Sequence, residues 1–153
     1  MLFLNAKRKD YLRQKEKARD LIQERLAHFG PLCGVRWKRI AIRNTRRSWG
    51  SCSSLGNLNF SYKLLYLPAC LRDYVIVHEL CHLKHLNHSP LFWAEVSAVM
   101  PDYKFRKREL RNIERKYGTS ITVLRLVATR HTCSHCIEEI KHVAEKDRLY
   151  LWA

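Results

Sequence analysis

Between residues 78 and 88 the chain carries four histidines and one glutamate, in a spacing that restricts what can be built around them. The stretch opens with the pattern HExxH, in which His78 and His82 are four residues apart and Glu79 follows the first histidine. On an α-helix this spacing places both imidazoles on one face, close enough to reach one metal ion. Glu79 would lie beside the ion without bonding to it, where its carboxylate can accept a proton from a water that the metal activates. The pattern therefore predicts a metal-binding helix with an acid/base residue.

Two histidines leave a zinc site one protein ligand short, and two more histidines follow. On a straight helix the Cα of His85 would lie roughly 10 Å from that of His78, too far for bonds of about 2 Å to one ion. His88 can reach the ion if the helix ends near Leu86 and the chain turns back at Asn87, since Asn tolerates a left-handed backbone. We expect His88 to complete the site and His85 to support a ligand or contact the substrate. Three histidines leave a coordination position open, which favours a catalytic zinc over a structural one.

Length and composition place this site in a small globular protein with one domain. The chain has 153 residues, of which 46% are hydrophobic and 28% charged, a balance that is typical of folded proteins. No apolar run approaches a membrane span, and the segment Met1–Asn5 is too short and too soon followed by basic residues for a signal peptide. We therefore expect a cytoplasmic protein without a membrane partner, and we expect its six cysteines to be free thiols.

Positive charge is the strongest bulk feature, with a formal net charge of +15. It gathers in two runs, Arg36–Arg47 and Lys104–Lys116, which flank the HExxH segment on both sides in the sequence. Solvated faces explain part of such charge, but its density also suits an anionic partner such as nucleic acid or a nucleotide. We expect the first run to face the substrate through Arg43, Arg46 and Arg47.

Hydrophobic periodicity predicts one helix and three strands before the HExxH segment. Residues 7–26 carry a helical apolar stripe, and Gly30-Pro31 is expected to end that helix. Three short alternating segments follow, at residues 35–43, 46–52 and 57–62. Their lengths and the turn residues between them predict a three-stranded antiparallel meander.

Three helices are expected after the strands. The first, at residues 69–86, is apolar on most faces and should lie in the centre of the fold. The second is capped by Ser89-Pro90 and ends at Pro101, and the third is a basic helix from Lys104 to Tyr117. The predicted fold class is α+β, with a short antiparallel sheet beside a central HExxH helix and further covering helices.

The last part of the chain differs in character from what precedes it. A β-like apolar run is followed by Cys133 and Cys136, two cysteines that are separated by two residues. Such a pair is half of a structural zinc site, and the second pair of ligands is not visible in the sequence. We interpret residues 1–118 as the metallohydrolase domain and residues 119–153 as a C-terminal extension of unknown role, whose loss should leave folding and metal content of the domain unchanged.

Several of these motifs together resemble the YgjP-like metallopeptidase family, a group of small bacterial zincin-like proteins similar in outline to the SprT-like proteases. The matching segments are Arg47–Cys52, Gly56–Asn59, His78–His82 and Asn87–Trp93. The resemblance extends from about residue 5 to residue 117 and implies a compact zincin core with a short sheet beside the metal helix. It also implies that Glu79 is the catalytic acid/base and that the zinc ligands are His78, His82 and His88.

Three functions are compatible with these features, and the first is a zinc peptidase acting on a peptide or protein. The second is a metal-dependent nucleotide phosphohydrolase, in which the arginine-rich strand holds the phosphates. The third is a basic nucleic-acid-binding module with a structural zinc. For the peptidase, the group that stabilises the oxyanion is left open among Arg47, Tyr62 and His85. The sequence does not constrain the oligomeric state.

Overall fold

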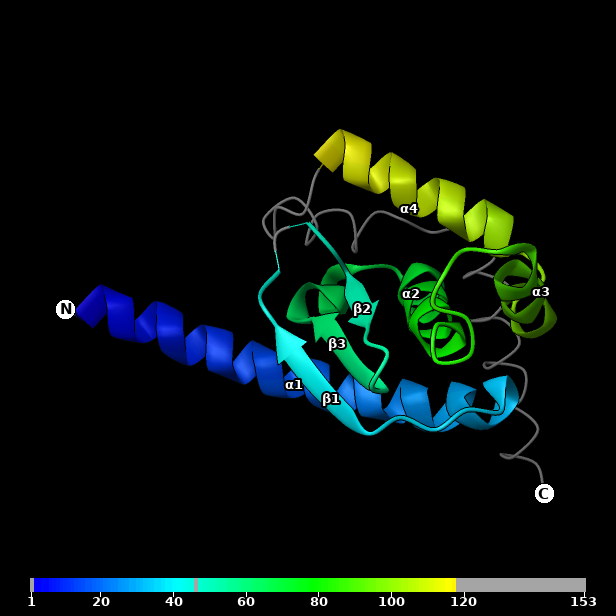
Figure 1. The fold of residues 1–153 in the computed structure, drawn as a ribbon. Helices are drawn as coiled ribbons and strands as arrows, with labels where there is room; N and C mark the ends of the chain where they lie inside the picture. The colour runs from blue at the N-terminus through cyan, green and yellow to red at the C-terminus, as the bar shows by residue number, and fades with distance from the viewer. Residues whose placement is uncertain (1, 46, 118–153) are drawn as a thin grey trace, which may run out of the picture.

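The computed structural model describes residues 2–45 and 47–117 of the chain. In chain order the elements are α1 (Leu2–Cys33), β1 (Arg39–Arg43), β2 (Gly50–Cys52), β3 (Asn57–Ser61), the 3-10 turn η1 (Tyr62–Tyr66), α2 (Ala69–Cys81), α3 (Pro90–Val99) and α4 (Tyr103–Tyr117). Figure 1 shows α2 at the centre, with the sheet and α1 on one side and α4 on the other. The predictions for residues 119–153 lie outside the described residues.

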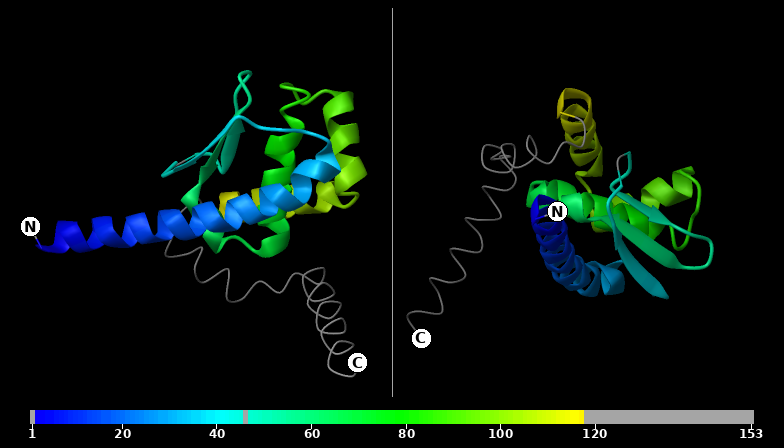
Figure 2. Two further views of the ribbon diagram at one scale, coloured as in Figure 1. Left: turned by 90° about the horizontal axis from the view of Figure 1, so that it is seen from below. Right: turned by 90° about the vertical axis from the view of Figure 1, so that its left-hand side faces the viewer.

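The first helix continues past its predicted end at Gly30-Pro31 and stops at Cys33. Pro31 lies in the last turn, where a lost backbone donor and a displaced carbonyl cost less than in a helix interior. The end is formed by Gly34, which has a φ of 63°. The amides of Gly34 and Val35 then bond back to the carbonyls of Pro31 and Gly30 at 3.1 and 3.2 Å, a common glycine-terminated helix end. The N-terminal part of α1 extends beyond the rest of the molecule (Figure 2).

The sheet is mixed, so the predicted antiparallel meander is wrong. Its strand order is β1-β3-β2, in which β1 is parallel to β3 and β2 is antiparallel to β3. A tight hairpin between β1 and β2 would need positive φ angles, which Asn44-Thr45 does not supply because it lacks a glycine. The β2–β3 connection does have one, since Gly56 has a φ of 80°. Among the described strands β2 pairs only with β3, so it forms one edge of the sheet. Both β1 and β2 are shorter than predicted.

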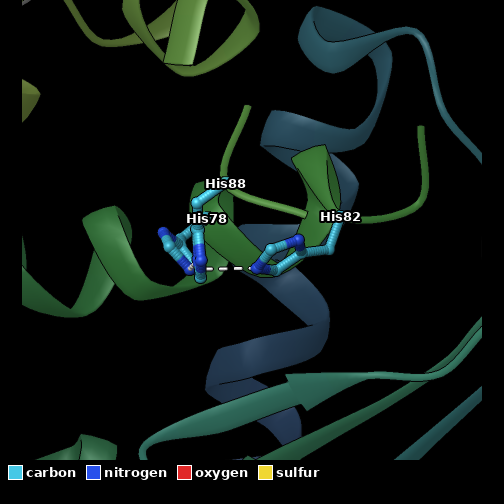
Figure 3. Close-up of side chains that lie close together, drawn as sticks. All are labelled: His78, His82 and His88. Atoms are coloured by element: carbon cyan, nitrogen blue, oxygen red, sulfur yellow. Dashed lines mark hydrogen bonds between the residues drawn. The ribbon is translucent and has the colours of Figure 1, made fainter. Parts of the chain in front are cut away.

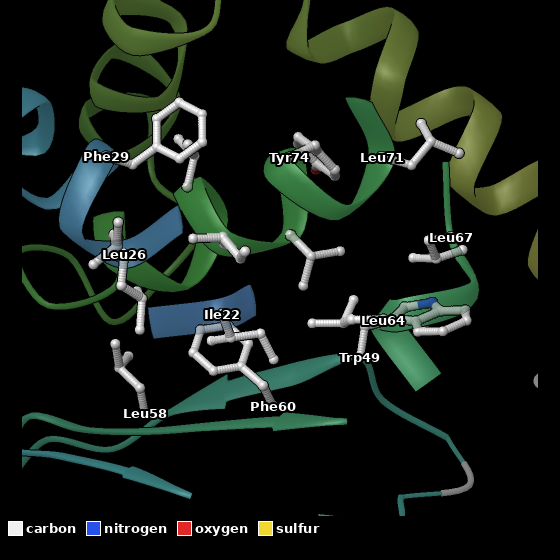
Figure 4. Packing of buried hydrophobic residues seen from close by; sticks show 14 of the residues in the cluster. Ile22, Leu26, Phe29, Trp49, Leu58, Phe60, Leu64, Leu67, Leu71 and Tyr74 are labelled. Carbon is white, nitrogen blue, oxygen red and sulfur yellow. The ribbon is translucent and has the colours of Figure 1, made fainter. Parts of the chain in front are cut away.

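The hydrophobic core lies between α1, the sheet and α2 (Figure 4). The predicted stripe of α1 is confirmed, because Ala18, Ile22 and Leu26 are fully buried. Opposite them lie Leu58 and Phe60 of β3, and the inner residues of α2 fill the space between. α2 is buried almost all round, as its run of apolar residues predicted. The helix that carries His78 and Glu79 is therefore held by packing on several sides.

Arginines of two neighbouring helices contact the first turns of α2. Arg25 of α1 donates two hydrogen bonds to the carboxylate of Asp73, at 2.9 and 2.7 Å. On the other side, Arg106 of α4 bonds to Asp102 at 2.8 Å and to the carbonyl of Cys70 at 3.0 Å. These contacts fix how α1 and α4 lie against α2. Within the described residues no helix has the length and hydrophobicity to cross a membrane.

Candidate metal centre

The turn after α2 brings the third histidine back, but not in the way that the sequence predicted. α2 ends at Cys81 instead of near Leu86, and His82 is its C-cap residue with helical angles (φ −65°, ψ −19°). The next two backbone amides bond to carbonyls three residues back, which tightens the chain into a turn. Asn87 does not adopt the expected left-handed conformation, since no described residue other than glycine has a positive φ.

Three histidine side chains converge at this turn (Figure 3). The Nε2 atom of His78 lies 3.1 Å from the Nε2 atom of His82 and 3.1 Å from that of His88. One ligand atom from each of these residues lies within 4.8 Å of the others, an arrangement that could hold a metal ion. Nitrogens that bind one tetrahedral zinc at about 2 Å lie roughly 3.3 Å apart. The two separations from His78 are close to this value, so the three side chains could hold one ion, and His85 is not part of the cluster.

The protonation of the three imidazoles also suits metal binding. The Nδ1 atom of His82 donates a hydrogen bond to the carbonyl oxygen of His85 at 2.9 Å, which leaves the Nε2 lone pair free for a metal. Burial, with further contributions from His82 and His88, lowers the pKa of His78 to about 3. Burial also lowers the pKa of His88, followed by the effects of His82 and Lys107. Both rings are neutral at physiological pH, the form that coordinates metals. His85 contributes its main-chain carbonyl oxygen to the hydrogen bond with His82, whereas we had expected its side chain to support a ligand or contact the substrate.

Aromatic residues of α3 hold the histidine rings in place. The helix starts as predicted, because the Ser89 hydroxyl accepts a hydrogen bond from the Phe92 amide at 3.4 Å. The buried Phe92 ring stacks on His82 with centroids 4.4 Å apart, and Trp93 stacks on His88 at 5.6 Å. The sequence placed both aromatic residues on the second of the three expected helices. It could not show that they contact the histidines, because that depends on how α3 returns across α2.

Glu79 lies directly against the sheet edge. Its side chain is only 7% exposed, and burial raises its pKa to about 7. A Cβ atom placed on Gly50 of β2 would be 2.7 Å from Cγ of Glu79 and 3.0 Å from its Oε1 atom. Only a residue without a side chain therefore allows β2 to approach this carboxylate so closely. Gly50 was not among the predicted site residues, although a glycine inside a strand often marks such an approach.

A pocket of about 490 Å³ opens over these groups. Its lining includes His78, Glu79 and His88, together with Gly50 from β2 and with Lys107 and Arg111 from α4. One wall is fixed by a hydrogen bond of 2.7 Å from the Trp49 indole to the Glu114 carboxylate, which connects the start of β2 to α4.

The residues predicted to bind substrate do not line this pocket. Arg43 and Arg47 are exposed outside it, the side chain of His85 is not part of its lining, and Arg46 lies outside the described residues. Their role in binding stays a prediction. The cations that do line the pocket belong to α4, the second basic run of the sequence.

Tyr62 was one of the candidates for stabilising the oxyanion, but the tyrosine that lines the pocket is Tyr74. Tyr62 is buried with its ring against Tyr11 and Tyr66, at 5.2 and 6.5 Å, and it does not line the pocket. Tyr74 does, because it precedes His78 by one helical turn on α2. Burial raises the pKa of Tyr74 to about 12, so its hydroxyl stays protonated and can donate a hydrogen bond.

Comparison with known proteins identifies the domain. The family model of the YgjP-like metallopeptidase domain matches residues 4–113. The chain belongs to this family. Among solved structures, this YgjP-like chain is similar to the metallopeptidase zymogen abylysin of Pyrococcus abyssi, with 27% identity and a TM-score of 0.53. The similarity covers 62% of this chain and 94% of the abylysin chain. No curated protein matches this YgjP-like chain. Family and structure together support an α+β metallopeptidase that acts on peptides or proteins and has a possible metal site of three histidines.

The choice between His88 and His85 as third ligand is directly testable by metal analysis. Protein purified without chelators should contain one zinc per chain. We expect His88→Ala to lose most of this metal on dialysis, because only two ligands are left. His85→Ala should keep it, because the contact to His82 comes from the main chain. Equal metal loss in both variants would contradict this assignment.

Proposed function

We propose that this protein is a zinc-dependent peptidase in which Glu79 acts as general base and then as general acid. The observation that carries the proposal is the position of Glu79. Its buried carboxylate and the converging histidines His78 and His88 line one pocket. Among the described residues this carboxylate has no salt-bridge partner, which is costly for a buried charge and argues for a chemical role. Membership of a metallopeptidase family supports the same reaction class.

The three Nε2 atoms of His78, His82 and His88 would hold the zinc. Imidazole donors suit this ion, and three of them leave one coordination position open. Zinc bound there would supply Lewis-acid chemistry, activating water and polarising the scissile carbonyl. The stacked rings of Phe92 and Trp93 keep two of the ligands from rotating away.

Glu79 would move the protons of the reaction. A general base works best when its pKa lies near the working pH, and in the metal-free protein burial raises that of Glu79 to about 7. A bound zinc ion would lower this pKa and favour the carboxylate form. The Glu79 carboxylate can therefore accept a proton from the attacking water and deliver it to the leaving amine. Tyr74 is the group we propose for hydrogen bonding to the developing oxyanion, because it is a protonated donor in the same pocket.

The edge of β2 would hold the substrate main chain. β2 pairs with β3 on one side only, and Gly50 on that strand lines the pocket. An extended peptide can add to such an edge by main-chain hydrogen bonds, independently of its sequence. This arrangement would lay the scissile bond across Glu79. The nucleotide-hydrolase hypothesis relied instead on arginines of β1 and the following loop, of which the described Arg43 and Arg47 do not line the pocket.

The test is an activity assay of the metal-loaded protein on several substrates. Chelator-treated protein should not cleave casein or a mixed library of quenched fluorescent peptides. Zinc should restore cleavage, and neither form should release phosphate from nucleoside triphosphates. Zinc-dependent release of phosphate together with no peptide cleavage would replace the proposal with the phosphohydrolase.

A further inference from the structure

A second cavity adjoins the metal pocket on the side of α4. It has a volume of about 910 Å³, and its lining includes Tyr103, Lys104 and Arg108 of α4. It shares Trp93, Lys107, Arg111 and Glu114 with the metal pocket, so the two form one continuous depression. We call this cavity the α4 groove. α4 begins beside α3 and runs past α2 (Figure 1).

The α4 groove is strongly positive. Among the described residues of its lining, the cations are Lys104, Lys107, Arg108, Arg111 and Arg115, and Glu114 is the one acidic residue. The carboxylate of Glu114 already accepts the hydrogen bond of Trp49. Within the described part of the chain, no carboxylate lies within 4.0 Å of Lys104, Lys107 or Arg111. These cations are therefore available to an anionic ligand.

Lys107 links the groove to the metal centre. Its ammonium lies 3.9 Å from the centroid of the Trp93 ring, and Trp93 stacks on the metal-ligand candidate His88. Burial, and after it the nearby charge of Arg111, lowers the pKa of Lys107. A bound anion reduces the repulsion between two cations at the mouth of a pocket. The Trp93 side chain would separate such an anion from the metal centre.

We propose that the α4 groove binds an acidic segment of the polypeptide substrate, so that the enzyme prefers proteins with clustered Asp and Glu residues near the cleaved bond. The inference rests on the proposed peptidase function and adds a substrate class to it. Continuity with the metal pocket lets one extended chain occupy both cavities. Guanidinium groups pair well with carboxylates, in bidentate geometry where both N–H groups can reach.

The aromatic residues of the groove favour a peptide over nucleic acid as the ligand. Proteins that bind single-stranded nucleic acid offer free ring faces on which bases stack. Here the Trp93 ring already stacks with His88 and with Tyr103, at 5.6 and 5.2 Å, and Lys107 lies over it. The charged side chains of the groove are accessible to a ligand, whereas the Trp93 ring is already in contact with other side chains of the protein.

Binding can be measured without cleavage in a Glu79→Gln background. A fluorescent peptide with four acidic residues is compared with a peptide of the same length in which Asn and Gln replace them. By fluorescence anisotropy in low salt, we expect the acidic peptide to bind at least about 10-fold more tightly, as one or two charge-assisted contacts would give. The preference should shrink as salt screens the charges.

Two double variants and one control locate the effect. Lys107→Gln with Arg111→Gln should abolish most of the preference. Lys104→Gln with Arg108→Gln, at exposed positions, should reduce it without affecting folding. The control is Lys9→Gln with Lys17→Gln, two exposed lysines of α1 that do not line the groove, which lowers the net charge equally. It should keep the preference.

The outcomes separate this inference from the peptidase function itself. Equal binding of both peptides, or equal losses in the control and in the groove variants, would overturn the inference even if the wild type cleaves peptides. A groove-dependent preference without any cleavage by the zinc-loaded wild type would uphold the groove and contradict the peptidase. A single-stranded oligonucleotide that binds more tightly than the acidic peptide, and only with the groove intact, would reassign the groove to nucleic acid.

Discussion

Replacing Glu79 with Gln is expected to lower kcat for peptide cleavage by about 10²- to 10⁴-fold, the usual contribution of a general acid/base. Gln has nearly the same shape but cannot accept the proton of the attacking water. One metal ion per chain should be retained, because the histidines are untouched. The measurement is kcat on a fluorescent peptide with zinc content determined on the same sample. Glu95→Gln is the matched control, since Glu95 pairs with Lys84 at 3.0 Å and does not line the pocket.

The same variant has a stability consequence that does not depend on activity. Burial raises the pKa of Glu79 in the folded protein to about 7, above the usual glutamate value of 4.5. Between these values the folded state binds more protons than the unfolded state, so the free energy of unfolding falls as pH rises. Above pH 7 the metal-free wild type must bury a charge that Gln does not carry. We expect metal-free Glu79→Gln to be more stable than metal-free wild type at pH 8 by about 1–3 kcal/mol, with a smaller difference at pH 5.

Urea unfolding of both metal-free proteins at the two pH values tests this. An equal pH dependence of the free energy of unfolding would mean that the Glu79 carboxylate is not perturbed. Full activity of Glu79→Gln would remove the residue from the proposed mechanism. A loss of metal together with activity would give it a role in holding the site.

Local patterns predicted much of the fold and of the candidate site. The HExxH spacing places His78 and Glu79 on α2, and the distance argument selected His88 over His85 for the cluster. Both of these predictions depend only on helix geometry and on residues close together in the chain. The cap of α3 by Ser89 and the buried stripe of α1 are predictable for the same reason.

What the sequence missed depends on contacts between distant segments. The order of the strands depends on how the chain crosses β3, and alternation within each strand carries no information on that. Lys107 and Arg111 line the pocket because α4 packs along α2, partly through the contact of Arg106 with Cys70. The strand arginines looked equally suitable in the sequence. Only the packing of helices and strands distinguishes the two basic runs.

Gly50 is the clearest of these cases, and its replacement is the second large effect we expect. Gly50→Ala should lower kcat/KM by about 10²-fold, because a shift of about 1 Å in a catalytic group costs that much. The new methyl group would overlap with Cγ of Glu79, which is buried and has little room to move. Backbone strain does not contribute, since the described glycines with positive φ are Gly34 and Gly56.

Gly30→Ala is the matched control, because a Cβ there would be equally close, 2.7 Å, to the Trp37 ring, which does not line the pocket. Both substitutions should lower the melting temperature, but only Gly50→Ala should lower kcat/KM per folded molecule while keeping its zinc. If Gly50→Ala retains wild-type kcat/KM, the carboxylate of Glu79 is not held where β2 approaches it. If both variants lose activity in proportion to lost folded protein, the close approach matters for stability alone. A loss confined to Gly50→Ala, with metal content unchanged, can be explained only by displacement of Glu79 or of the substrate strand beside it.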